Sequence, residues 1–157
     1  MYEEKINAYF DAPERRAELV EAISRLVRIR SVREEPLPGM PFGPGPAAAL
    51  AEGLKLAEEL GFATRNYDNY VGTADLNDKE TALHILCHLD VVGEGTGWTV
   101  TEPYAPKEVD GMLYGRGTDD DKGPVAAVLL AMKAVKELGV PLPVSYTHLT
   151  LPTILRV

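Results

Sequence analysis

The chain has 157 residues, 45% of them hydrophobic, with a formal net charge of −8 at pH 7 and a pI near 4.9. This length and composition predict one soluble globular domain with a real core, and the acidic balance argues against nucleic acid and anionic membranes as partners. Cys87 is the only cysteine, so no internal disulfide can form. The first residues lack the basic and apolar regions of a signal peptide, and no apolar run is long enough to cross a bilayer, so we expect a cytoplasmic protein. The sequence leaves the oligomeric state open.

The first part of the chain predicts two helices. Apolar residues recur on one helical stripe across residues 13–29, which indicates an amphipathic helix. After a proline-rich, irregular stretch, Pro46 suits the first turn of a second helix. Its inward-facing positions would be Leu50, Leu54, Ala57 and Leu60. Gly61 is placed to cap this helix, and Phe62 to make the hydrophobic contact that often follows such a cap.

Three strands are predicted next. Residues 63–67 and 70–76 are short strands on either side of a turn at Asp68-Asn69. Residues 82–92 are apolar at most positions of both faces, which predicts a central strand that is covered on both sides.

Two side chains of the 82–92 strand are interpreted as parts of the core. His84 shares a face with His88 but lies about 13 Å from it along the strand, so we interpret it as a packed or hydrogen-bonded core histidine rather than a ligand. Cys87 points to the opposite face and is interpreted as a small core residue.

The second part of the chain predicts a loop at residues 93–106 and a third helix at 122–138, ended by Gly139 and Pro141. Trp98 and Tyr104 are expected to pack the loop onto the sheet. Alternating helices and strands predict an α/β fold with a central mixed sheet flanked by helices, and with ligands bound just past the strand ends.

Polar residues in two places carry the candidate chemistry. In His88-Leu89-Asp90 the histidine and the carboxylate share one face of the strand. A carboxylate beside an imidazole can fix the ring of a metal ligand. Three aspartates at positions 119–121 lie in a glycine-flanked turn before the third helix, where free N–H groups and the helix dipole favour negative charge. Taken alone, a His-x-Asp on a strand is more often structural, and three aspartates before a helix are more often a cap and a solvated face. Together the two motifs are interpreted as half of a two-metal hydrolase site.

In this order, the motifs resemble one family, the dinuclear zinc peptidases and deacylases. PepV-like bacterial dipeptidases, glutamate-releasing carboxypeptidases, aminoacylase and acetylornithine deacetylase belong to it. The resemblance covers about residues 13–142 and is strongest for the PepV-like dipeptidase branch. The residues that carry it are His88-Leu89-Asp90-Val91-Val92, Gly97-Trp98, Pro103-Tyr104, Asp110-Gly111 and the segment from Leu113 to Pro124.

The resemblance implies specific roles at the site. His88 is expected to bind one zinc ion and Asp120 to bridge two, while Asp90 belongs to the catalytic site as the carboxylate that holds His88. Co²⁺ or Mn²⁺ can substitute for zinc in such enzymes. Asp119 is expected to be an exposed turn residue, and the Asp120–Asp121 peptide is expected to be cis.

The resemblance further implies a zinc-dependent dipeptidase that hydrolyses an amide bond with a metal-activated water. Its substrate would be a small peptide. An N-acyl amino acid deacylase of the same family, and a non-catalytic fragment or binding relative, are the alternatives. The general-base glutamate, the remaining metal ligands and the lid domain of the family are missing from this sequence, so the chain as written is expected to be inactive.

Residues 143–157 are interpreted as foreign to the protein. Val144 to Thr153 back-translates into the transposon-end adapter of a common sequencing-library chemistry, so His148 is not recruited as a third ligand. We therefore predict a partial metallopeptidase catalytic domain at residues 1–142, truncated and followed by a translated adapter at 143–157.

Overall fold

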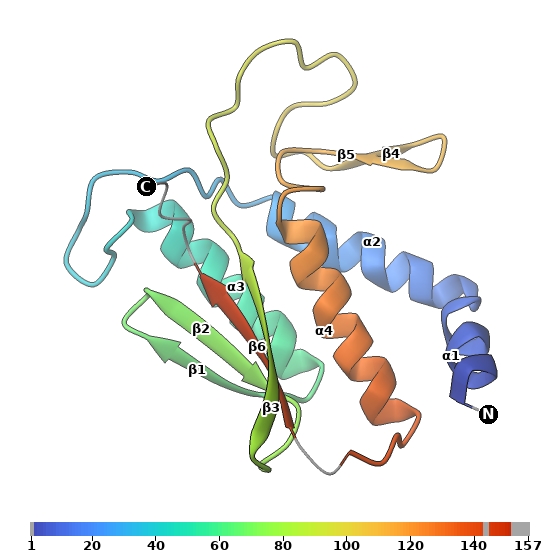
Figure 1. Cartoon of the computed structure of the whole chain (residues 1–157). Helices are drawn as coiled ribbons and strands as arrows, with labels where there is room; N and C mark the ends of the chain where they lie inside the picture. The colour runs from blue at the N-terminus through green and yellow to red at the C-terminus, as the bar shows by residue number, and fades with distance from the viewer. Residues whose placement is uncertain (1, 143–144, 152–157) are drawn as a thin grey trace.

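The computed structural model describes residues 2–142 and 145–151, which form a mixed sheet with helices packed against it (Figure 1). The helices are α1 (Tyr2–Phe10), α2 (Pro13–Val27), α3 (Pro44–Glu59) and α4 (Lys122–Glu137). The strands are β1 (Ala63–Tyr67), β2 (Val71–Asp75), β3 (Thr81–His88), β4 (Lys107–Val109), β5 (Met112–Tyr114) and β6 (Ser145–Leu151). Among the described residues, no helix combines the length and hydrophobicity that a membrane crossing requires.

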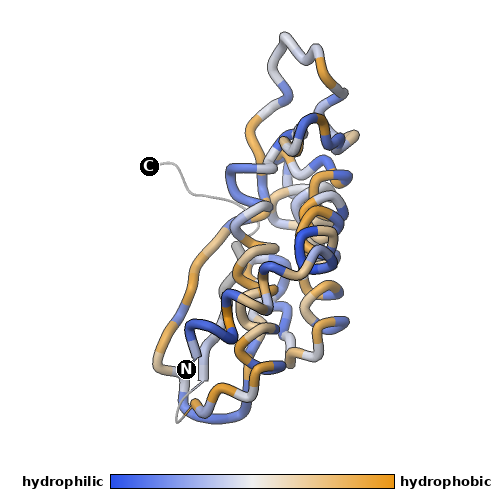
Figure 2. The backbone as a smooth tube through the Cα atoms, turned by 90° about the vertical axis from the view of Figure 1, so that its right-hand side faces the viewer, coloured by the Kyte–Doolittle hydropathy of each residue, from blue (hydrophilic) through white to orange (hydrophobic). Residues whose placement is uncertain are grey.

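The main sheet has the strand order β1-β2-β6-β3. β1 and β2 are antiparallel, as are β2 and β6, whereas β3 and β6 are parallel. Helices α3 and α4 contact the strands and α2 packs against both helices, so all three lie on one side of the sheet (Figures 1 and 2). The predicted α/β fold with a mixed sheet and flanking helices is confirmed.

Turn and cap residues define the first helices and strands much as expected. α3 begins at Pro44, two residues before the predicted Pro46, because Gly43 takes the N-cap position with a φ of 91°. At its other end, the Gly61 N–H donates to the Glu58 carbonyl at 2.8 Å and the Phe62 N–H to the Ala57 carbonyl at 3.1 Å. These two bonds form a Schellman cap, as predicted.

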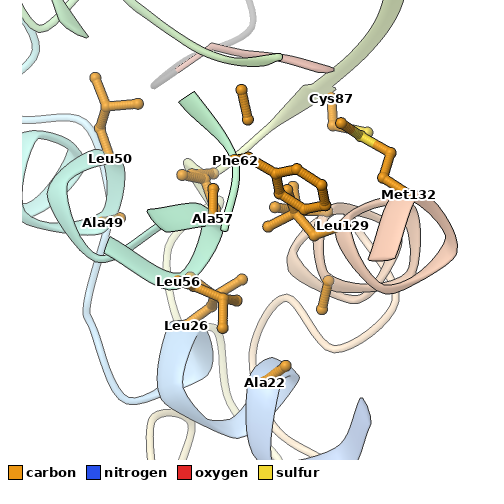
Figure 3. Packing of buried hydrophobic residues seen from close by; sticks show 14 residues of the cluster. Ala22, Leu26, Ala49, Leu50, Leu56, Ala57, Phe62, Cys87, Leu129 and Met132 are labelled. Carbon is orange, nitrogen blue, oxygen red and sulfur yellow. The ribbon is translucent and has the colours of Figure 1, made fainter. Parts of the chain in front are cut away.

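The core lies between the sheet and the three helices. Phe62 is 5% exposed, which confirms the hydrophobic contact expected beside the cap. Leu26, Leu50 and Leu89 are completely buried in the same cluster. Figure 3 shows this cluster, to which α2, α3, α4 and β3 all contribute. Cys87 belongs to it as well, as the sequence predicted.

The prediction of a central strand at residues 82–92 is wrong for the part of the chain that the structure describes. β3 ends at His88 and stands at the edge of the sheet, where within the described residues it pairs only with β6. Its Leu86 side is uncovered, with Leu86 itself 61% exposed, because the helices pack on the opposite face. His84 is exposed for the same reason, so its assignment as a core histidine is also wrong.

One helix and one hairpin were not expected from the sequence. Helix α1 leaves Tyr2, Ile6 and Phe10 exposed. Strands β4 and β5 form a hairpin whose turn residues, Asp110 and Gly111, have φ values of 50° and 78°. An Asp-Gly pair is a strong hairpin signal because both turn positions require positive φ.

Strand β6 comes from the segment interpreted as a translated adapter. Residues 145–151 lie between β2 and β3, while residues 143–144 and 152–157 are outside the described part of the chain. A segment rich in threonine, leucine and tyrosine can pair with strands whatever its origin. The pairing therefore does not bear on the assignment of residues 143–157, which stays a prediction.

Candidate metal centre

The two predicted motifs come together at the C-terminal end of β3 and the N-terminus of α4. They line a cavity of about 570 Å³, together with Val32 and Arg33 from the segment after α2. β3 is held beside this segment after it ends: the Ser31 hydroxyl donates to the Leu89 carbonyl at 2.6 Å, and the Val91 N–H to the Ser31 carbonyl at 3.2 Å. Hydrogen bonds between segments far apart in the sequence thus hold this part of the cavity lining together.

His88 is held between two carboxylates. Its Nδ1 lies 3.1 Å from both the carbonyl oxygen and the Oδ1 of Asp90, and its Nε2 lies 2.9 Å from the Oδ1 of Asp120. With the proton on Nδ1 donated to Asp90, Nε2 presents a lone pair. Two acceptors, the Nε2 of His88 and the Oδ1 of Asp120, then lie 2.9 Å apart. Because two lone pairs at this distance repel each other, a cation or a proton is required between them. An imidazole and a carboxylate are ordinary zinc ligands, so the residues present fit a metal ion.

The three side chains differ in exposure. His88 is 14% and Asp90 16% exposed, whereas Asp120 is 83% exposed. Asp90 therefore lies behind the histidine and Asp120 in front of it, on the solvent side of the cavity. Asp119 is also exposed and lines the cavity, but the carboxylate at His88 Nε2 is that of Asp120.

Glycines allow the 115–123 turn to bring Asp120 to His88. A Cβ at Gly117, where φ is +88°, would lie 2.9 Å from the Val91 side chain, and one at Gly123 would lie 2.1 Å from the carbonyl oxygen of Thr118. The Lys122 N–H also donates to the Gly117 carbonyl at 3.0 Å. The Asp120–Asp121 peptide is cis, as the family resemblance implied.

Sequence reasoning missed two residues at this site, Asp121 and Lys122. The Oδ2 of Asp121 accepts a hydrogen bond from the backbone N–H of His88 at 3.0 Å. Lys122 is completely buried, and its Nζ donates to the Ile29 carbonyl at 2.6 Å. Burial lowers the pKa of Lys122 to about 8, with the negative charge of Asp90 acting in the opposite direction. A lysine that directly follows a helix-capping aspartate was the available signal, but its burial does not follow from sequence.

Glu94 fastens the 93–106 loop to the wall of the cavity. Its carboxylate accepts hydrogen bonds from the Arg30 Nε at 2.6 Å and the Tyr104 hydroxyl at 3.0 Å. Its carbonyl accepts from the Trp98 indole and from an Arg116 Nη, both at 2.8 Å. Burial and the Glu94 carboxylate raise the pKa of Tyr104 to about 12. Trp98 and Tyr104 therefore hydrogen-bond within the loop, and their expected packing onto the sheet stays a prediction.

This chain contributes a partial set of metal donors. Among residues 2–142 and 145–151, no group of three or more His, Cys, Asp or Glu side chains is arranged to hold a metal ion. His88 and Asp120 form the donor pair, and Asp90 supports His88 from behind.

Known proteins with similar sequences carry dipeptidase names. Residues 84–152 match the model of Peptidase family M20/M25/M40. A Bacillus subtilis (strain 168) protein named Putative dipeptidase YtjP is 38% identical over 130 residues, which cover 82% of this chain and 28% of that protein. A similarly named protein of Staphylococcus saprophyticus is 37% identical over 142 residues, or 89% of this chain and 29% of that protein. The chain thus spans less than a third of the length of these relatives.

Solved structures of the same family share the fold. Human carnosine dipeptidase 1 matches with a TM-score of 0.76 and 30% identity, over 95% of this chain and 34% of that one. An M20 metallo-carboxypeptidase from Sulfolobus solfataricus matches with a TM-score of 0.68 over 86% of this chain and 30% of that one; at 21% identity, it shows the fold alone. Residues 84–152 thus match the Peptidase family M20/M25/M40 model, and the similar relatives and solved structures agree with the resemblance found in the motifs.

Proposed function

We propose that this chain supplies one histidine ligand and the bridging carboxylate of a two-zinc dipeptidase. The observation that carries the proposal is the arrangement of His88 between Asp90 and Asp120 on the wall of the cavity. The family match and the dipeptidase names of the relatives support the reaction type. The proposed ions are zinc, with Co²⁺ or Mn²⁺ as substitutes.

Each of the three residues has a distinct proposed role. Asp90 accepts a hydrogen bond from the Nδ1–H of His88, which leaves the Nε2 lone pair available to a metal ion and increases its basicity. His88 would hold one ion through this lone pair. Asp120, whose side chain is 83% exposed beside Nε2, would be the carboxylate shared by the two ions.

Two bound ions would supply a nucleophilic water at neutral pH and polarise the amide carbonyl. The chain's own contribution is to hold the metal-ligating side chains in place and to form a cavity with the hydrogen-bonded 93–106 loop on one side. A general base that takes the proton of the water would come from a part of the protein beyond residues 1–142.

The proposed substrate is a small peptide. We further propose that the protein is cytoplasmic, because its single cysteine gives no sign of an oxidising compartment. We expect no nucleic acid or membrane partner, because its net charge of −8 disfavours binding to either.

The test uses the extended chain, meaning the gene product read through its genomic continuation beyond residue 142. We expect it to hydrolyse dipeptides with a kcat/KM at least about tenfold above that for N-acetyl amino acids, a difference of about 1.4 kcal/mol in barrier. A chelator should abolish turnover and added zinc should restore it. Faster cleavage of N-acetyl amino acids would identify a deacylase instead, and turnover that survives chelation would rule out the metal mechanism. A protein that binds these compounds without cleaving them would be a non-catalytic relative.

We also propose that residues 143–157 are a translated adapter rather than native sequence. Genomic DNA amplified across codon 142 is expected to encode a different continuation, which enters a strand and then a Glu-Glu ligand motif. If the genome instead encodes residues 144–157 as written, the proposal is wrong, and His148 becomes a candidate third ligand.

A further inference from the structure

We propose that Asp121 is a positioning residue of the metal centre, because its carboxylate ties the end of β3 to the start of α4 and thereby fixes His88 against Asp120. The inference rests on the proposed function. The Oδ2 of Asp121 accepts a hydrogen bond from the backbone N–H of His88 at 3.0 Å. Burial and the nearby Asp121 carboxylate also raise the pKa of the Cys87 thiol to about 11, so two consecutive residues of β3 face this carboxylate.

The capping geometry of α4 shows that this contact replaces a more common one. Asp121 occupies the N-cap position, where an aspartate normally accepts a hydrogen bond from an N–H in the first turn of its own helix. Its side chain makes no such bond. Its carbonyl accepts the Val125 N–H at 3.0 Å, so the helix begins normally while the carboxylate points to the strand.

The contact closes a short ring of interactions around His88. Asp121 holds the backbone N–H of His88, and the neighbouring Asp120 lies 2.9 Å from the Nε2 of the same residue. Because Asp120 and Asp121 are joined by one peptide bond, fixing one carboxylate on the strand restricts where the other can lie. Asp90 restricts the orientation of the His88 ring through its contact with Nδ1. Removing Asp121 should therefore loosen the spacing between the two donors while leaving both donors in the chain.

The experiment uses the 157-residue chain and follows zinc binding by NMR at the ring nitrogens of His88. Asp121→Ala removes the acceptor, whereas Asp121→Asn keeps an oxygen of the same reach without the charge. Asp119→Ala is the matched control, an exposed aspartate two residues away. We expect the zinc dissociation constant to rise about tenfold or more in Asp121→Ala, as for other residues that orient a ligand. It should stay within about threefold in Asp121→Asn and in Asp119→Ala.

A second readout needs no metal. The His88 amide should exchange with solvent at least about tenfold faster in Asp121→Ala than in the parent, and not in Asp121→Asn, because the acceptor protects this N–H on the strand at the edge of the sheet. If Asp121→Ala fails to fold, Asp121→Glu takes its place with the same expectations, since the added methylene displaces the oxygens.

The outcomes separate the two proposals. A parent chain whose His88 signals do not respond to zinc would refute zinc binding by His88 and Asp120 in this chain, and amide exchange would then decide the role of Asp121. Zinc affinity unchanged in Asp121→Ala would overturn the positioning role. So would Asp121→Asn behaving like Asp121→Ala, because the charge rather than the hydrogen bond would then be responsible.

Discussion

Replacing Asp120 with alanine in the extended chain is expected to abolish both its binuclear zinc content and its peptidase activity. Asp120 is the carboxylate that faces the Nε2 of His88 at 2.9 Å, and it is the proposed bridge between the ions. Without it, both ions lose a ligand at once. We expect kcat/KM to fall at least about a thousandfold, about 4 kcal/mol in barrier, because metal-ion activation of water and carbonyl supplies several kcal/mol.

Asp119→Ala is the matched control for this prediction. Asp119 lines the same cavity and is also exposed, so its removal changes the local charge equally. It should leave zinc content and kcat/KM within about threefold of the parent, the scale of a surface charge change. Zinc per chain is measured by mass spectrometry after dialysis, and activity with a dipeptide. Equal losses in the two variants would show that the bridge was assigned to the wrong residue.

Local chemistry made helices α2, α3 and α4 and the β1–β2 hairpin predictable. The Gly61–Phe62 cap, the proline at the start of α3 and the Asp68-Asn69 turn all depend on interactions within a few residues. Such features follow from side-chain geometry and backbone preference. The same reasoning explains why the boundaries of α2 and α4 agree with the apolar stripes to within two residues.

The environment of β3 was not predictable, because it depends on distant parts of the fold. An apolar face shows that a strand can be buried, not that a partner covers it in a given chain. Leu86 and His84 illustrate this, since both lie on the face opposite the helices and are exposed. The chain spans less than a third of its relatives' length. The apolar pattern predicted that both faces of β3 are covered, but the described residues contain no element that covers its outer face.

The candidate site was predictable where side chains meet side chains. His88, Asp90 and Asp120 could be selected because the two motifs together resemble those of a known family, and the structure brings the three side chains together. Asp121 and Lys122 were missed because their partners are backbone groups, the His88 N–H and the Ile29 carbonyl. Every residue except proline has an N–H and every residue has a carbonyl, so the sequence gives no sign of which one a carboxylate or an ammonium will contact.

The 157-residue chain itself is expected to be inactive, in contrast to the extended chain. Catalytic zinc normally has about three protein ligands and one water, whereas the described residues offer His88 and Asp120 to a pair of ions. The exposed edge and outer face of β3 should also favour association between chains, because an uncovered apolar strand edge invites pairing. On the proposed mechanism, incomplete metal ligation alone would prevent turnover, since neither ion would have a closed set of ligands and the described site contains no assigned base.

Both proteins would be loaded with zinc and assayed at equal concentration against the same dipeptides and N-acyl amino acids. A His88→Ala variant of the 157-residue chain sets the background from contaminating peptidases. We expect the 157-residue chain to match that background, at least about ten-thousandfold below the extended chain, a barrier difference of about 5.5 kcal/mol. Turnover within about tenfold of the extended chain, a gap of only about 1.4 kcal/mol, would mean that the described residues already hold a working site. The assignment of a missing base and missing ligands would then be wrong, because two donors cannot sustain such a rate without them.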